Sequence, residues 1–219
     1  AYNCIDNFSA AYLKKLYEEP AYYMIQDNHI YFPDFNNGLI IHENGRKKTL
    51  RTKNDSEYSN TIWIFGDSRV SGMLIENCYT ISSILQMKID KGDLQYRVEN
   101  CGIPGREIER MVLQIKETPV GKGDMVILAT GFYEYDGDIL KNVAAWNIFI
   151  NEAYDFCKGI ESSFLYVNLP TLLEMNDLTD EEIEILEIFN TTEFTEYSRE
   201  KIDKCNEIIS YFCLNHGIA

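Results

Sequence analysis

Thr61-Ile-Trp-Ile-Phe-Gly-Asp-Ser-Arg-Val-Ser-Gly72 begins as an apolar run that stops abruptly at Gly66-Asp67-Ser68. The run predicts a buried strand over 61–66, and the sequence that follows predicts a helix over 73–89. A strand that ends in a sharp turn before a helix is a place where α/β proteins expose a nucleophile. Ser68 would then lie among free backbone N–H groups that favour the oxyanion formed when a serine attacks a carbonyl. Taken alone, the tripeptide favours a simpler interpretation, in which Asp67 and Ser68 only cap the helix.

Beyond residue 60, strand-like and helix-like segments alternate along the chain. The strand candidates are 61–66, 96–100, 124–130 and 163–168. The helix candidates are 73–89, a segment after Pro104-Gly105, 139–158, a segment opened by the capping box Thr179-Asp-Glu-Glu182, and 196–215 with Gly217 beyond its end. Strands that alternate with helices form a parallel sheet covered on both faces. We therefore predict an α/β fold with a three-layer, doubly wound, flavodoxin-like and mostly parallel sheet.

Three polar loops follow the predicted strands. Gly66-Asp67-Ser68, Asn100-Cys101-Gly102 and Thr130-Gly131 each stand at the carboxyl end of one strand. In a doubly wound sheet these ends lie at the same edge, which is where ligands bind. We expect the three loops to meet there.

The first 58 residues differ in character from the rest. They are rich in tyrosine, contain a helix candidate over 9–19 that Pro20 stops, and place Asn44-Gly45 between two extended runs, which predicts a β-hairpin. We predict an N-terminal helix and hairpin extension over 1–58 and an α/β domain over 59–219 that ends before its last strand. The basic cluster of the chain lies on and just after the hairpin, where it would either contact an acidic partner or, as we expect, form a solvated rim; it comprises Arg46, Lys47, Lys48, Arg51 and Lys53.

Composition excludes several classes of function. A formal net charge of −15 disfavours nucleic acid and anionic membranes as partners. No apolar run approaches the roughly 18–20 residues that span a bilayer, and no basic-then-apolar leader is visible, so we expect a cytoplasmic protein. The six cysteines are scattered without a C-x-x-C pair, which is typical of buried thiols in a reducing compartment. We expect no metal and no cofactor, and the sequence defines no oligomeric state.

Two motifs resemble those of the SGNH hydrolases, also called the GDSL esterase/lipase superfamily. Phe65-Gly-Asp-Ser-Arg-Val-Ser-Gly72 resembles its first block, with Ser68 in the nucleophile position. Val98-Glu-Asn-Cys-Gly-Ile-Pro-Gly105 resembles its second block, in which Gly102 would offer an oxyanion-hole N–H. The resemblance covers roughly residues 60–170 and implies a serine esterase or acyl hydrolase.

The third and fourth blocks depart from the family pattern. Where the third block has Gly-x-Asn-Asp, this chain has Tyr133 and Glu134, and losing one oxyanion donor typically costs ~100-fold or more in rate. Tyr133 is therefore either a weak substitute donor or a packing residue. The family's Asp-x-x-His block is absent, because none of the three histidines stands three residues after an aspartate. His216 belongs to the end of a helix, and we do not expect it to be the base.

The resemblance therefore implies a small acyl ester as substrate, such as an O-acetyl group on a carbohydrate, and a Ser68 acyl-enzyme. Water would release the acid, or a second hydroxyl would accept the acyl group. Arg69 is a further candidate for substrate binding, although a surface arginine is the commoner interpretation. We expect little or no hydrolysis by residues 1–219 alone. The alternatives are a non-catalytic SGNH-like binding domain and, third, an unrelated nucleotide-binding sheet, which lacks the required glycine loops.

Overall fold

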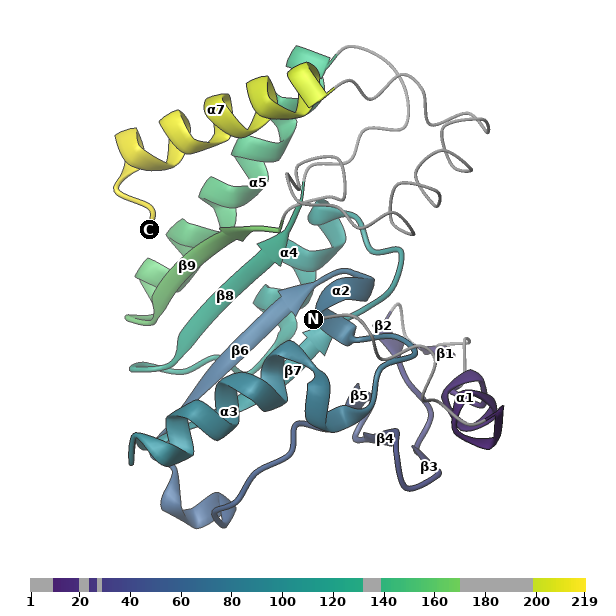
Figure 1. Cartoon of the computed structure of the whole chain (residues 1–219). Coiled ribbons are helices and arrows are strands. Elements are labelled where there is room, and N and C mark those ends of the chain that lie inside the picture. The colour runs from purple at the N-terminus through teal and green to yellow at the C-terminus, as the bar shows by residue number, and fades with distance from the viewer. Residues whose placement is uncertain (1–9, 20–23, 27–28, 132–138, 170–198) are drawn as a thin grey trace.

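The structure, a computed structural model, describes residues 10–19, 24–26, 29–131, 139–169 and 199–219. At its centre lies a parallel sheet built from β6 (Asn60–Gly66), β7 (Tyr96–Gly102), β8 (Met125–Thr130) and β9 (Ser163–Asn168) (Figure 1). The strand order is β7-β6-β8-β9, so the order reverses at β6. The register sets Gly66 beside Gly102 on one side and beside Ala129 on the other. The ends of the three predicted strands therefore meet at one edge, as expected.

Helices cover both faces of this sheet, which confirms the predicted α/β class. Alternate residues of β6 enter two separate cores, with Ile62 and Ile64 on one face and Trp63 and Phe65 on the other. α3 (Ile81–Lys91) packs on the first face. The second face is covered by α4 (Ile108–Glu117), α5 (Ile139–Gly159) and α7 (Arg199–His216) (Figure 1).

The segment after Ser68 is not the single helix predicted over 73–89. It consists of the short α2 (Ser68–Ser71), a turn, the 3₁₀ helix η3 (Asn77–Tyr79) and then α3. Gly72 ends α2 in the left-handed region, with φ 66°, and Leu74 has φ 59°. Thr80 starts α3 by accepting a hydrogen bond from the Ser83 N–H. The apolar spacing extends across this break, which is why periodicity alone missed it.

The described part of the N-terminal region contains two small antiparallel sheets, one α-helix and one 3₁₀ helix. α1 spans Ala10–Tyr17, β1 Met24–Gln26, β2 His29–Tyr31, β3 Phe35–Asn36, β4 Ile41–Glu43, β5 Arg46–Lys47, and the 3₁₀ helix η2 Asp55–Glu57. The predicted hairpin is confirmed, because β4 and β5 pair antiparallel around Asn44 and Gly45, whose φ angles are 54° and 76°. Two positive φ angles are what a tight hairpin turn requires.

The expected solvated rim is wrong for Lys47. Its side chain is buried, with a relative exposure of 2%, and Nζ lies 2.9 Å from Oε1 of Glu19. The neighbouring Lys48 points outward and pairs with Glu43 on the surface. Strand alternation explains the difference, because successive side chains point to opposite faces.

The C-terminal segment ends against the sheet. Gly217 follows α7 with φ 66°, and the Ile218 N–H donates to the Cys213 carbonyl, as in a Schellman cap. The carbonyl of Ala219 then accepts a hydrogen bond from the Tyr166 N–H of β9, at 2.8 Å. The helix predicted from the 179–182 capping box lies outside the described residues. In the described part of the chain, no helix has both the length and the apolar character needed to span a bilayer.

Candidate active site

Ser68 stands at the carboxyl end of the central strand with its side chain exposed to solvent. It is the first residue of α2, and its carbonyl accepts hydrogen bonds from the N–H groups of Gly72 and Met73, at 3.0 and 3.3 Å. The Ser71 hydroxyl donates to the same carbonyl at 3.0 Å. Within the described residues no partner is recorded for the Ser68 hydroxyl. The backbone of this residue is held while its hydroxyl stays available.

Asp67 and Arg69 fix the turn on either side of Ser68. Asp67 caps α2 by accepting from the Arg69 N–H at 2.9 Å, and its carboxylate also accepts from Nε and Nη2 of Arg69, at 3.1 and 2.6 Å for the nearest oxygens. Nη1 of Arg69 donates to the Leu169 carbonyl at 3.1 Å, just beyond β9. The predicted role of Arg69 in substrate binding stays a prediction. In the structure, Arg69 connects the Ser68 turn to the residue that follows β9 by hydrogen bonds.

Two glycines allow α2 to sit directly on the strand ends. A Cβ at Gly66 would lie 2.2 Å from the Ala129 carbonyl oxygen and 2.3 Å from a methyl group of Val70. A Cβ at Gly102 would lie 2.2 Å from the Ser71 backbone nitrogen. No side chain fits at either position, so the close approach of these backbones depends on glycine.

The N–H of Gly102, predicted as an oxyanion donor, has an acceptor within the protein. It donates at 3.0 Å to Oδ1 of Asn100, a buried residue whose Nδ2 donates to the Val70 carbonyl at 3.0 Å. Asn100 thereby links the end of β7 to α2, a role that sequence reasoning did not assign. Its signal was an amide side chain at the end of an otherwise buried strand, where a polar group requires partners.

Gly105 lies three residues beyond Gly102, in the loop that follows β7. Its φ is 67°, it is exposed, and a Cβ there would meet nothing within 4 Å. Among the described residues no acceptor is recorded for its N–H. The N–H groups of Gly102, which ends β7, and of Ile103, which donates to the Gly66 carbonyl at 2.9 Å, are thus committed, whereas that of Gly105 is not.

The loop after β8 is described only as far as Gly131. A Cβ there would lie 2.5 Å from the Leu169 carbonyl oxygen and 3.1 Å from Nη1 of Arg69, so Gly131 itself packs closely against both residues. Tyr133 and Glu134, the departures in the third block, lie outside the described residues.

The side chains of two histidines are described, and neither is hydrogen-bonded to Ser68. His42 is buried and its Nε2 lies 2.9 Å from Oε1 of Glu19. His216 is on the last turn of α7, where Nδ1 lies 2.8 Å from the Phe212 carbonyl and the ring stacks on Phe212. α7 packs on α5, and β8 separates β9 from the strand that leads to Ser68.

Other chemistry has little support in the described residues. They contain no group of three or more His, Cys, Asp or Glu side chains placed to hold a metal ion. Burial raises the pKa of Cys101, beside the site, to about 12, although the charge of Arg46 opposes the shift. Its thiol is therefore protonated at neutral pH and is a poor nucleophile.

Several solved structures are similar to this chain. TesA matches at 14% identity and a TM-score of 0.49, over 73% of this chain and 76% of that one. A member of the lipolytic G-D-S-L family from Veillonella parvula matches at 16% identity and 0.46, over 73% and 75%. A variant of the acetyl xylan esterase Axe2 from Geobacillus stearothermophilus matches at 14% identity and 0.48, over 74% and 75%.

No family model matches the chain. No characterised protein matches it in sequence. By name, the similar structures include G-D-S-L-type lipolytic proteins and esterases. At these identities the roles of individual residues rest on the geometry of this chain.

Proposed function

We propose that the protein is a serine esterase or acyl hydrolase in which Ser68 is the nucleophile. The observation that carries this proposal is an exposed hydroxyl in a turn whose backbone is fixed on every side. Asp67, Arg69 and two obligatory glycines hold that turn, while the Ser68 side chain takes no part in holding it. Such a rigid frame around an uncommitted hydroxyl is what nucleophilic catalysis requires.

The reaction would proceed in two acyl transfers. The Ser68 oxygen attacks the ester carbonyl carbon while a base removes the hydroxyl proton, and collapse of the tetrahedral intermediate expels the alcohol, which takes up that proton. Water then attacks the acyl-enzyme, releasing the carboxylic acid and restoring Ser68. If a sugar hydroxyl attacks instead of water, the same intermediate yields an acyl transfer.

The oxyanion would be met by backbone donors from two loops. The Ser68 N–H is one, and no acceptor is recorded for it among the described residues. The Gly102 N–H would serve only by leaving Oδ1 of Asn100, whereas that of Gly105 is uncommitted. We therefore propose the Gly105 N–H, in addition to that of Gly102, as a candidate oxyanion donor.

A small, neutral acyl ester is the substrate class that the electrostatics favour. With a formal net charge of −15, the protein repels anionic esters and does not repel an O-acetylated carbohydrate. The proposed substrate is accordingly a short-chain ester on a sugar or on a similar small metabolite.

A second candidate function is a non-catalytic domain that binds an acylated ligand. It is favoured by one observation: neither His42 nor His216 reaches Ser68. The reading frame downstream of Ala219 distinguishes the two functions. An Asp-x-x-His motif within a few tens of residues supports the hydrolase, and a stop codon directly after Ala219 supports the binding domain.

The catalytic proposal is tested by hydrolysis of 4-nitrophenyl acetate and of acetylated xylo-oligosaccharides by the complete gene product. Ser68→Ala should abolish turnover above the buffer rate. Ser56→Ala, at an exposed serine of η2, is the matched control and should retain it. Turnover that survives in Ser68→Ala would remove Ser68 as the nucleophile.

A further inference from the structure

A buried cluster of ionisable side chains contacts the turn that follows the Ser68 helix and involves none of the residues assigned above to the site. It consists of Glu19, His42 and Lys47, with relative exposures of 6%, 1% and 2%. Oε1 of Glu19 is 2.9 Å from both His42 Nε2 and Lys47 Nζ. Burying three ionisable groups is costly unless each has partners, so the arrangement calls for a reason. We call these three residues the Glu19 cluster.

The Glu19 cluster ends on the backbone of the turn that follows α2. Lys47 Nζ donates to the Gly72 carbonyl at 2.5 Å, and the other carboxylate oxygen of Glu19 accepts from the Leu74 N–H. One side chain of the ion pair therefore holds a carbonyl of the turn, and the other holds an N–H two residues away.

That turn has an unusual backbone conformation and is hydrogen-bonded directly to Ser68. Gly72 and Leu74 both have positive φ, a conformation that a leucine adopts only when its surroundings enforce it. The N–H of Gly72 donates to the Ser68 carbonyl. A shift of the turn would therefore move the residue that carries the nucleophile.

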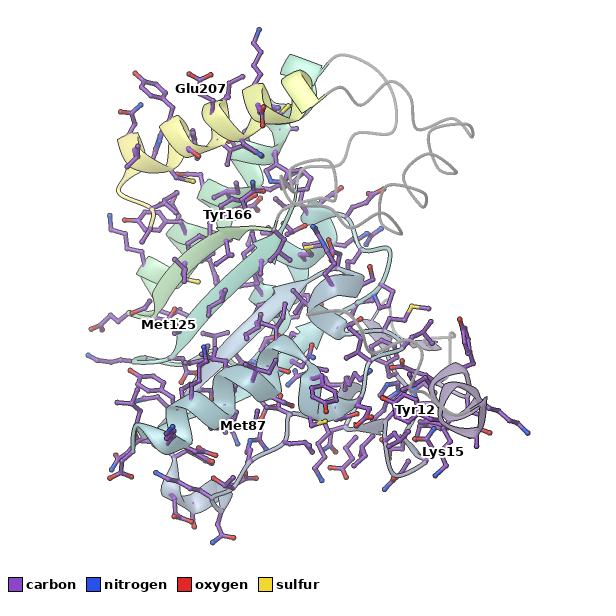
Figure 2. The ribbon with its side chains drawn as sticks, in the orientation of Figure 1. Tyr12, Lys15, Met87, Met125, Tyr166 and Glu207 are labelled. Carbon is purple, nitrogen blue, oxygen red and sulfur yellow. The ribbon has the colours of Figure 1, made fainter. Side chains whose placement is uncertain are left out.

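The N-terminal region forms hydrogen bonds at two more residues of the connection between α2 and α3. Tyr12 of α1 donates through its hydroxyl to Glu76, and Figure 2 shows Tyr12 on the side of α1 turned toward the rest of the molecule. The buried Asn77 side chain accepts from the Ile41 N–H at 2.8 Å and donates to the Lys48 carbonyl at 2.6 Å. The connection from α2 to α3 is thus held at four of its residues, namely Gly72, Leu74, Glu76 and Asn77, by described residues of the N-terminal region.

We propose that the Glu19 cluster is a positioning device for Ser68: the Glu19–Lys47 pair clamps the turn at Gly72 and Leu74 and so sets the place of the nucleophile. This inference rests on the proposed function. It gives the N-terminal region a part in the reaction without contact to the substrate. Positioning of this kind is sensitive, because a displacement of about 1 Å costs a reaction on the order of 100-fold.

The test compares two neighbouring lysines, Lys47 with a buried side chain and Lys48 with an exposed one. Lys47→Met removes the donor to Gly72 while keeping the aliphatic stem, and Glu19→Gln removes the charge while keeping an acceptor for Leu74. Lys48→Met, one residue along and exposed on the same hairpin, is the control. Three quantities are measured on the complete gene product: amide hydrogen exchange at Leu74, the rate at which a fluorophosphonate labels Ser68, and kcat and KM for 4-nitrophenyl acetate.

The clamp predicts that Lys47→Met and Glu19→Gln speed exchange at Leu74, slow labelling of Ser68 about tenfold or more, and lower kcat with little change in KM, while Lys48→Met changes none of these. Labelling and kcat that match the wild-type values in folded Lys47→Met would overturn the inference and leave the esterase proposal standing. If the wild-type protein does not label at Ser68 at all, the esterase proposal fails and the positioning role falls with it. A variant that does not fold is replaced by Lys47→Arg, which keeps the charge but misplaces the donor and should give the same changes in smaller degree.

Discussion

At the scale of single residues, the placement of Ser68 depends most on Gly102. A methyl group there would lie 2.2 Å from the Ser71 backbone nitrogen, and backbone cannot move aside as a side chain can. We expect Gly102→Ala to cost about 2 kcal/mol or more in the free energy of unfolding, as overpacked sites do, and to slow Ser68 labelling because α2 is displaced. Urea titration and adduct formation measure the two effects.

Gly159 provides the control for that substitution. It ends α5, its φ is not positive, and a Cβ added there would meet no atom within 4 Å. Gly159→Ala should leave stability unchanged or slightly raised, because alanine loses less chain entropy on folding. Equal effects of the two substitutions would show that the contact at Gly102 is not the cause.

At the scale of elements, the connection between α2 and α3 is held by the buried side chain of Asn77. It bonds the backbone of Ile41 through both its oxygen and its nitrogen, at 2.8 and 2.9 Å, and the Lys48 carbonyl at 2.6 Å. Asn77→Ala removes the partners of the Ile41 N–H and of the Lys48 carbonyl, whereas the Ile41 carbonyl keeps the Lys48 N–H at 2.9 Å, and we expect a loss of about 3 kcal/mol. Asn151→Ala, at an exposed position of α5, should cost less than about 0.5 kcal/mol in the same titration.

Asp90 makes the stability of the fold depend on pH, through its hydrogen bonds between α3 and the segment before β6. Burial raises the pKa of this carboxyl, but hydrogen bonds from Thr52, Tyr58 and Gln86 outweigh burial and hold the pKa below its usual value. A depressed pKa means that the ionised group stabilises the fold fully above about pH 4 and loses this effect as the pH falls through the folded-state pKa.

The consequence is tested with Asp90→Asn in unfolding titrations between pH 7 and pH 2. The variant should be less stable than wild type at pH 7, and the difference should shrink steadily below about pH 4. Asp155→Asn, on the exposed side of α5, is the reference. A difference that stays constant down to pH 2 would contradict the role of the ionised carboxyl.

The elements also show what periodicity can and cannot predict. The sequence predicts the strand over 163–168 with its observed bounds, because a short apolar run between polar breaks is typical of a strand, although β9 lies at the end of the sheet and none of its residues is buried. The break after α2 was missed because the contacts that enforce it come from Glu19, which is distant in sequence. For the same reason the sequence could not show that Lys47 is buried, since its partner is 28 residues away.

At the scale of the whole molecule, the sheet order separates the nucleophile from the last helix. Ser68 follows β6, whereas α7 packs on α5 and its tail meets β9, with β8 between the two strands. The alternation of strands with helices along the sequence predicts this parallel, doubly wound sheet. It also predicts that Ser68 and Gly102 lie at the same edge of the sheet. Two hydrogen bonds that position the site join Asn100 to the Val70 carbonyl and Arg69 to the Leu169 carbonyl. They depend on tertiary packing, so no local sequence pattern predicts them.

This separation leads to a prediction for His216. If the helix end bearing it is remote from Ser68, His216→Ala should change the rate of fluorophosphonate labelling by less than twofold and leave the fold intact, since its ring bonds only the Phe212 carbonyl within the described residues. A loss of labelling of 100-fold or more, in the range typical of removing a catalytic base, would make His216 the base and require a different arrangement of the chain.

The most direct measurement of the central claim is the intact mass of the complete gene product after treatment with a fluorophosphonate, followed by mapping of the modified peptide. If Ser68 is the nucleophile, a single adduct forms on the peptide containing Ser68, absent from Ser68→Ala and present in Ser56→Ala. An adduct on another residue, or equal labelling of wild type and Ser68→Ala, would contradict that claim.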